Sequence, residues 1–588
     1  MPLRNLSQRW FRLARHEQVV LTVLAVLVGV LVAYAAIAFR LAIAGAQWLG
    51  YGFAVEDIHE KLSLLPWWHV LLAPALGGLS VGLFLKYLMP GGRAQNVSHV
   101  IEANALSGGR MDLRQGLASA VVSSASLGIG ASAGREGPMV HFGATLASAV
   151  AQALKLNQSL ARTILGCGVA AAVSASFNAP IAGVFFALEV VIGHYALSAF
   201  APIVIASVAG TVIARIHLGA EPAFNLPPSH IVSLWEFPAF LILGVVAAIV
   251  AIIFMHSIMF ADRVVGRIAV PEWLKPAGGG LVVGVIAIWF PHIVGVGYGA
   301  TDDALKGLFP LSLLLALLVL KTAATAVSLG CRFGGGVFSP SIYIGAMTGG
   351  AFGLIAAKVF PELASSHGVY ALVGTSAVAA AVLGAPISTI LIVFEMTADY
   401  KVTIAVMVAT TTASVIVQQV LGKSFFHWQL ENRGLDLRGG RARHLLHALN
   451  VRQLVSADFQ QVAAEASVGD IKRLLGNHSS GDFVVSDSDG RLVGTFSFTD
   501  LREVIFNPDL DELVNARDLV DARAPVITPG AELERVLRLM DMDKIDSIAV
   551  VEDLDSRRVI GLVHRKDVLL AFNRALLEAQ AEEHDERR

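Results

Sequence analysis

Charged residues are scarce in this chain, and their scarcity excludes a water-soluble fold for most of its length. Asp, Glu, Lys and Arg make up 15% of the 588 residues, whereas hydrophobic residues make up 55%. Typical soluble domains carry about 25% charged residues. More than half of the charges lie beyond residue 430. The chain therefore divides into a long apolar body and a shorter polar tail, and it is too long for one compact domain.

Cysteine and the common catalytic motifs are also lacking. The two cysteines, Cys167 and Cys331, lie in the apolar body without metal-ligand spacing, so we interpret them as small core residues. The chain contains no HExxH zinc motif, no Walker loop and no GxSxG nucleophile elbow. These absences predict a protein that is not an enzyme, holds no metal, requires no cofactor and binds no nucleic acid.

The N-terminal 17 residues form a basic segment with four arginines, Arg4, Arg9, Arg12 and Arg15. An apolar run from Gln18 to Phe39 follows. This run is longer than the core of a typical signal peptide and long enough to span a bilayer. We therefore expect a retained first membrane helix, with the N-terminus in the cytoplasm by the positive-inside rule.

The apolar body, residues 18–430, reads as a multi-pass all-α membrane domain. Its clearest further spans are Val70–Leu88, Ala199–Ile216, Ile231–Met259, Gly278–Phe290, Leu311–Val327 and Val402–Leu421. Between them, apolar segments such as Gly134–Gly143 and Gly334–Gly345 are short and broken by Gly and Pro. Broken helices at membrane depth are tolerated where they line a cavity, and in transporters they mark the substrate site.

The body contains an internal repeat. Gly-Ala follows both Pro138 and Pro340 by five and six positions, and both Pro180 and Pro386 stand in the sequence Ala-Pro-Ile. A glycine precedes each of the latter prolines by 12 positions, and a glutamate follows by nine: these are Gly168 with Glu189, and Gly374 with Glu395. Matched order and spacing predict a duplicated, pseudo-symmetric body.

The repeat gives a chemical interpretation of Glu136, a costly acid at membrane depth. Two broken helices are expected to begin near Glu136–Pro138 and near Phe338–Pro340. Each helix start leaves free N–H groups and roughly half a positive charge. Two such ends make an anion site that binds weakly enough to release its ion. Glu136 is then a tethered anion that blocks the site until it is protonated. The alternative is a permanent structural ion pair with Arg135.

These motifs resemble the CLC family of chloride channels and chloride/proton antiporters. Gly134-Arg135-Glu136-Gly137-Pro138 matches the family's gating-glutamate motif, and Gly335-Gly336-Val337-Phe338-Ser339-Pro340 matches its second anion-site motif. Phe177-Asn178-Ala179-Pro180 also fits. The resemblance implies a body built from an inverted repeat of broken helices and a homodimer with one pore per subunit. It also implies two cytoplasmic termini and, for a protein of the prokaryotic type, the bacterial inner membrane.

The resemblance also implies the anion-binding residues. They are Arg135, Gly137, Gly336, Val337 and Phe338, together with Gln95 and Phe426. The last two are departures from the family pattern. Gln95, in Ala94-Gln95-Asn96-Val97-Ser98, stands where the family has a serine, with Ser98 as an alternative donor. Phe426 stands where the family has a pore tyrosine, which predicts an apolar inner gate.

A third departure concerns protons. The family's antiporters carry an inner glutamate directly after the acid that aligns with Glu189, and this chain has Val190 there. Valine at this position is typical of the family's channels. The resemblance therefore favours channel-like chloride conduction. A chloride/proton antiporter in which Glu136 and Glu189 carry protons is the alternative.

The polar tail resembles a pair of α/β CBS domains, residues 450–508 and 515–577, between a linker at 431–449 and a charged tail at 578–588. Gly494–Asp500 aligns with Gly561–Asp567 at an offset of 67. The resemblance implies an adenine nucleotide near Ser497, Asp500 and Asp567, whereas the residues alone equally predict that the two aspartates cap helices. A CBS-regulated divalent cation transporter, the remote alternative, would need acids clustered in the pore, whereas the apolar body has isolated acids such as Glu102, Glu189 and Glu395.

Overall fold

The structure is a computed structural model with two compact units, residues 1–436 and 437–588. The described residues are 17–55, 57–89, 91–195, 197–219, 224, 231, 233–362, 364–435, 451–475, 482–502, 504–520 and 524–584. The division between the units falls six residues after the predicted end of the membrane body. The N-terminal arginines predicted to set the topology lie outside the described residues.

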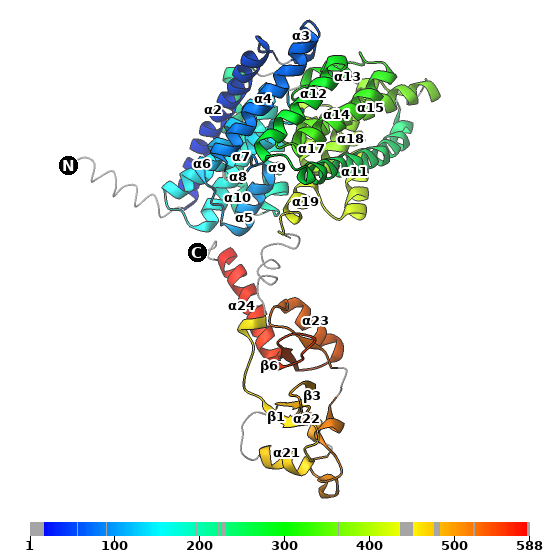
Figure 1. Ribbon diagram of the computed structural model, residues 1–588. Coiled ribbons are helices and arrows are strands. Elements are labelled where there is room, and N and C mark those ends of the chain that lie inside the picture. Colours follow the sequence, from blue (N-terminus) through cyan, green and yellow to red (C-terminus); the bar gives the residue numbers. More distant parts are fainter. Residues whose placement is uncertain are drawn as a thin grey trace, which may run out of the picture. The chain divides into compact units, whose positions relative to one another are not determined.

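The first unit is helical throughout its described part (Figure 1). Its first half contains α2 (Glu17–Tyr51), α3 (Ile58–Leu62), α4 (Trp67–Leu88), α5 (Val97–Leu106), α6 (Leu113–Gly128), α7 (Glu136–Ala153), α8 (Gln158–Phe177), α9 (Pro180–Phe186), a π-helical turn (Ala187–Ile192) and α10 (Leu197–Leu218). Its second half contains α11 (Phe237–Arg267), α12 (Lys275–Trp289), α13 (Tyr298–Leu305), α14 (Leu311–Gly330), α15 (Phe338–Val359), α16 (His367–Leu383), α17 (Pro386–Thr397), α18 (Tyr400–Leu421) and α19 (Phe425–Glu431).

Eight helices of the described part are long and apolar enough to span a membrane. Five of the predicted spans lie within them, and Ile231–Met259 begins six residues before its helix, α11. Gly278–Phe290 corresponds to α12, which is only 15 residues long. The spans Gln158–Phe177 and Phe338–Val359 were not predicted as such. Their apolar stretches are 78% and 61% buried in protein. Helices enclosed by other helices need small residues for close packing, and their mean hydropathies, 1.5 and 1.4, are the lowest of the eight, so they stand out less in the sequence.

Close glycine contacts confirm the internal repeat. A Cβ atom on Gly168 of α8 would lie 2.5 Å from the carbonyl oxygen of Gly143 in α7. A Cβ atom on Gly374 of α16 would likewise lie 2.5 Å from the carbonyl oxygen of Gly345 in α15. The same backbone approach thus occurs once in each half, and only glycine allows it.

The two halves also cap each other's helices. Both α9 and α17 begin at a proline, which suits the first helical position because it lacks the N–H group that would be unpaired there. Glu395 of α17 accepts hydrogen bonds from the backbone N–H groups of residues 181 and 182 in α9, at 2.9 and 2.8 Å. Glu189 accepts from Ile387 and Ser388 in α17, at 3.0 and 2.9 Å. These reciprocal hydrogen bonds connect the two halves of the membrane unit.

The second unit contains two similar α/β copies. The first has β1 (Gln460–Ala463), α21 (Val468–Leu475), β2 (Asp482–Ser486), β3 (Leu492–Ser497) and α22 (Phe498–Leu501); the second has β4 (Val526–Ile527), α23 (Leu533–Asp543), β5 (Ser547–Val551), β6 (Val559–His564) and α24 (Arg565–His584). In each sheet a parallel pair is followed by an antiparallel pair. The antiparallel pairs β2–β3 and β5–β6 contain Gly494 and Gly561, the first residues of the two aligned segments. The helix that closes the first copy has only four residues, and α24 continues into the predicted tail.

Candidate anion site

The two halves of the membrane unit meet at a pair of glycines. Gly134 donates its N–H to the carbonyl of Gly336 at 2.7 Å, and Gly336 donates to the carbonyl of Gly134 at 2.8 Å. The pairing is antiparallel. Helices α7 and α15 each begin two residues after their glycine. Their N-termini therefore converge at this point.

A small cavity of about 20 Å³ lies beside the glycine pair. This is room for about one water-sized particle. Its lining residues are Asn96, Val97, Gly137, Val140, Leu329, Gly335, Gly336, Val337, Phe338, Phe425, Phe426 and Gln429. No charged side chain lines it among the described residues. The structure therefore brings together five predicted site residues from three distant parts of the sequence, around a cavity whose polar groups are amides.

Glu136 begins α7 and is completely buried. The hydroxyl of Tyr298 donates a hydrogen bond to one carboxylate oxygen, and the hydroxyl of Ser339 donates to the other. Nε of Arg135 lies 3.6 Å from the carboxylate, so the ion pair proposed as the alternative does form. Burial among these groups holds the carboxylate in one place. We call Tyr298 and Ser339 the hydroxyl latch.

Tyr298 was not identified from the sequence. It begins α13, 162 residues from Glu136, and no motif connects the two. The guanidinium carbon of Arg135 lies 4.6 Å from the centroid of the Tyr298 ring, an arrangement that favours a cation–π interaction. Phe224 packs edge-on against the same ring. These contacts fix the ring while its hydroxyl reaches Glu136.

A second cavity, of about 180 Å³, is lined by two residues that contact Glu136, Arg135 and Tyr298. We call it the Tyr298 pocket; Arg40, Gln47, Ile58 and Gly297 also line it. Helices α3 and α13, which contribute to it, lie at the top of the membrane unit in Figure 1, opposite α5 and α19. Of the two residues next to Glu136 in the chain, Arg135 lines this pocket and Gly137 lines the small cavity.

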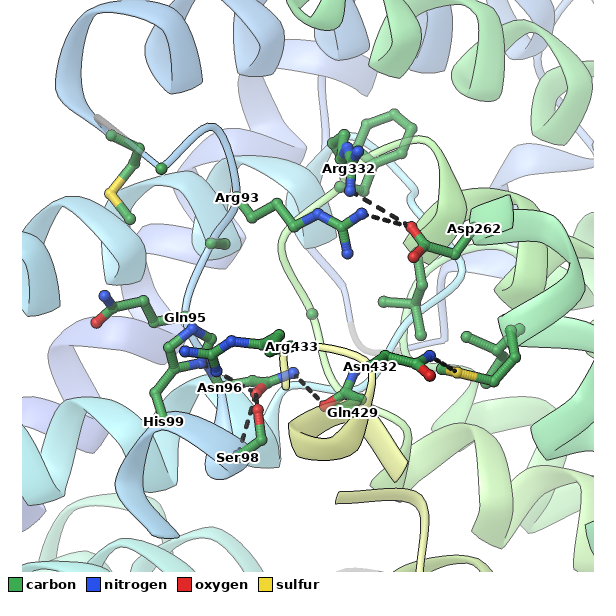
Figure 2. A pocket seen from close by; sticks show the side chains of 18 of the residues that line it. Arg93, Gln95, Asn96, Ser98, His99, Asp262, Arg332, Gln429, Asn432 and Arg433 are labelled. Atoms are coloured by element: carbon green, nitrogen blue, oxygen red, sulfur yellow. Dashed lines mark hydrogen bonds and ion pairs between the residues drawn. The ribbon is translucent and has the colours of Figure 1, made fainter. Parts of the chain in front are cut away.

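A third and larger pocket, of about 500 Å³, opens at the α5 and α19 end (Figure 2). We call it the wide pocket. Arg93 pairs with Asp262 across it at 2.7 Å, and Arg332 pairs with the same carboxylate at 3.3 Å. Four residues line both this pocket and the small cavity: Asn96, Leu329, Gly335 and Gln429. The two spaces therefore adjoin.

Two amides lie where the wide pocket narrows into the small cavity. The side-chain nitrogen of Asn96 donates to the side-chain oxygen of Gln429 at 3.2 Å (Figure 2). The oxygen of Asn96 is already used as the N-cap of α5, where it accepts from the backbone N–H of Ser98 at 3.1 Å. Asn96 therefore presents donors to the passage. We call Asn96 and Gln429 the amide neck.

Gln95, the residue expected to bind the anion, lies in the wide pocket instead. Its side-chain nitrogen donates to Gln115 at 2.8 Å, and it is not among the residues that line the small cavity. Ser98, the alternative donor, gives its hydroxyl to Asn96 at 2.7 Å. Asn96, the next residue, lines both the wide pocket and the small cavity, and the anion-binding role expected of Gln95 stays a prediction. Gln429 lies three residues after Phe426, on the same face of α19.

The predicted proton and nucleotide residues have other partners in the structure. Val190 is buried, and both oxygens of the neighbouring Glu189 cap α17. In the second unit, Asp500 accepts hydrogen bonds from the backbone and hydroxyl of Ser497, at 2.7 and 2.9 Å. Asp567 lies in the first turn of α24. Capping therefore accounts for Asp500, and adenine nucleotide binding stays a prediction.

Comparisons with known proteins agree with this architecture. Residues 77–418 match the family model described as voltage gated chloride channel, and residues 451–507 and 516–574 match the CBS domain model. A ClcB-like chloride channel protein of Ralstonia nicotianae is 34% identical over 393 residues, which cover 66% of this chain and 91% of that protein. The voltage-gated ClC-type chloride channel ClcB of Escherichia coli is 29% identical over 399 residues, or 67% and 94% of the two chains.

Solved structures show the same fold. A slow cyanobacterial chloride/proton antiporter superimposes with a TM-score of 0.63 at 22% identity, over 70% of this chain and 97% of its own. A eukaryotic CLC transporter superimposes with a TM-score of 0.61 at 20% identity, over 93% and 97%. The predicted fold, a CLC-like membrane body followed by a CBS pair, is therefore confirmed.

Proposed function

Because this chain belongs to the voltage-gated chloride channel family and carries a pair of CBS domains, we propose that it conducts chloride through a pathway gated by Glu136. The chain is an integral membrane protein. The proposed path runs from the wide pocket through the amide neck and the small cavity, past Glu136, and into the Tyr298 pocket. Chloride is the substrate, and protons act on the gate.

The observation that supports this most directly is the position of Glu136 in the chain, between Arg135, which lines the Tyr298 pocket, and Gly137, which lines the small cavity. A carboxylate held there by the hydroxyl latch excludes a second anion by charge and by volume. Protonation removes that charge and weakens the hydrogen bonds that the two hydroxyls donate. The neutral side chain is then free to leave, and the anion meets the converging helix N-termini, whose N–H groups attract it without a fixed cation.

Channel-like conduction is favoured over strict exchange. An exchanger needs a route that delivers protons to Glu136 from the wide-pocket side. Val190 cannot carry a proton, and Glu189 already uses both oxygens to cap α17. Chloride/proton antiport is the alternative, because Glu136 is itself protonatable and a structure with this fold belongs to a protein described as a chloride/proton antiporter.

The test is a flux assay on the full-length protein reconstituted in liposomes, with chloride and pH electrodes read together. A chloride gradient is imposed in the absence of a proton gradient. The proposal expects chloride to leave and no protons to move uphill. Proton movement in fixed proportion to chloride would establish antiport instead. Absence of chloride flux under all pH conditions would contradict both versions.

The wide pocket is proposed to face the cytoplasm. Arg433 lines this pocket, and the soluble unit begins only a few residues later, at residue 437. A CBS pair that follows this end of the body supports the assignment, as do the N-terminal arginines. A homodimer in the bacterial inner membrane is part of the same proposal. Accessibility of single cysteines introduced at the two pockets would test the orientation.

A further inference from the structure

Lys321 is a completely buried lysine within the membrane-spanning helix α14. Its ammonium group donates to the backbone carbonyls of Ile293 and Gly295, at 3.0 and 2.9 Å. It also lies 5.0 Å from the centroid of the Tyr343 ring. Across the described chain, no carboxylate lies within ion-pair distance of this nitrogen. A buried charge without an acidic partner is costly, and at membrane depth such residues generally serve an ion pathway.

The two carbonyls belong to the segment that forms one wall of the Tyr298 pocket. Gly295 and Gly297 line that pocket, and α13 begins directly afterwards with Tyr298. Gly297 has a φ of +88° and packs closely against the lysine, because a Cβ atom there would lie 3.2 Å from the Lys321 nitrogen. Lys321 therefore stands directly behind the backbone wall of the pocket, near the tyrosine of the hydroxyl latch.

The surroundings of Lys321 decide what its charge can act on. Arg40 and Arg135 line the same pocket, so the pocket carries positive charge on its surface as well as behind its wall. Tyr343 is the titratable group that faces Lys321 from α15, and its hydroxyl is buried without a hydrogen-bond partner. The two carbonyls orient the ammonium group but do not neutralise it. An anion that enters the Tyr298 pocket would supply a negative charge close to these positive groups.

We propose that Lys321 is a positioning residue whose buried positive charge draws anions into the Tyr298 pocket and holds the 293–297 segment that presents Tyr298 to Glu136. This rests on the proposed chloride conduction. The charge acts through the low-dielectric pocket wall, where screening by solvent is weak. Because the lysine does not contact the anion, it raises anion occupancy without trapping the ion as a direct lysine–chloride pair would.

Substitutions at Lys321 separate its charge from its hydrogen bonds. Lys321→Gln keeps a donor for the carbonyls but removes the charge, whereas Lys321→Arg keeps both. Chloride binding is measured by titration calorimetry on the purified full-length protein after chloride removal. Lys321→Gln is expected to weaken binding about tenfold, the effect of one charge acting over roughly 10 Å at an effective dielectric constant of about 20. Lys321→Arg is expected to bind like the wild type.

The matched control is Lys358→Gln, because Lys358 is an exposed lysine in the last turn of α15 and lines none of the three cavities. This variant is expected to bind chloride like the wild type. Wild-type affinity in Lys321→Gln would overturn the proposal while leaving the proposed function intact. Wild-type protein that neither binds nor conducts chloride would overturn the proposed function itself.

If Lys321→Gln does not fold, Lys321→His provides a second test. Lys321→His also donates a hydrogen bond, and its imidazole becomes charged at low pH. Its chloride affinity is expected to increase from about pH 8 to about pH 5 by a larger factor than in the wild type. Glu136 contributes equally to both proteins, so the difference reports the charge at position 321. An identical pH dependence in the two proteins would contradict the proposal.

Discussion

Gly134 and Gly336 exchange two backbone hydrogen bonds, one in each direction, 202 residues apart in the sequence. This pairing fixes the register between the two halves at the start of α7 and α15, directly beside the small cavity. Because both helices start two residues later, their free N–H groups are held towards a common space. The anion site is therefore a consequence of backbone geometry, and side chains mainly control access to it.

Gly336→Ala tests that geometry. A Cβ atom at this position would lie 3.1 Å from the Cα atom of Gly137, which is backbone and cannot move away easily. We expect a destabilisation of about 1–3 kcal/mol, typical of overpacking, together with a loss of chloride flux. Gly278→Ala is the control, because a Cβ atom there meets nothing within 4 Å. Equal thermal stability of the two variants would contradict the close approach.

Glu136→Gln tests the gate. In the wild type, flux should rise as pH falls, because protonation releases the carboxylate from its blocking position. The glutamine cannot ionise, so the variant should conduct at all pH values and lose this dependence. Glu236→Gln is a matched control, since Glu236 is also buried and accepts hydrogen bonds from the hydroxyls of Ser365 and Tyr370. A wild-type pH profile in Glu136→Gln would exclude a tethered blocker.

Tyr298→Phe tests the hydroxyl latch. The variant keeps the ring that packs against Arg135 but removes the donor to Glu136. A hydrogen bond to a charged group contributes about 1.5–3 kcal/mol, so chloride flux at neutral pH should rise about tenfold or more. Tyr51→Phe is the control, because Tyr51 donates to the backbone of Ile129 at 2.9 Å and not to the gate. Equal flux in both variants would show that the latch does not hold the gate closed.

The sequence predicted the parts of this site that depend on local backbone geometry. Glu136, Gly336 and Phe338 lie in short motifs at helix starts, where Gly and Pro spacing restricts the conformation. Tyr298 could not be predicted, because its contact with Glu136 depends on how α13 packs in three dimensions. Gln95 shows a second limit. Near a helix start, adjacent residues reach different spaces, because Asn96 lines the small cavity whereas Gln95 lines only the wide pocket.

Gln429→Leu tests whether the anion is bound by the amide neck or, as the sequence predicts, by Gln95. Leucine is close to glutamine in size but has no donors, so an anion would lose a polar partner where the wide pocket adjoins the small cavity. We expect chloride flux to fall several-fold. Gln95→Leu breaks a comparable amide pair with Gln115 in the wide pocket and should leave flux nearly unchanged. The opposite order of effects would return the anion-binding role to Gln95.

Glu189→Gln and Glu395→Gln form a symmetric pair that tests whether Glu189 moves protons. Each glutamate caps the first turn of the other half's helix, so each substitution removes a charge that interacts favourably with a helix N-terminus. Capping of this kind contributes about 0.5–2 kcal/mol, so both variants should lower the melting temperature by a similar few degrees. Both variants should keep nearly wild-type chloride flux per folded protein, with a nearly wild-type pH dependence.

A proton role for Glu189 would break this symmetry. Glu395 makes the equivalent cap from the other half of the repeat, so it reports the structural effect alone. Suppose that the two variants had the same melting temperature but only Glu189→Gln altered the pH profile of flux. Glu189 would then carry protons as well as cap α17. This result would favour chloride/proton antiport over channel-like conduction, because the chain would have a proton-carrying group next to Val190.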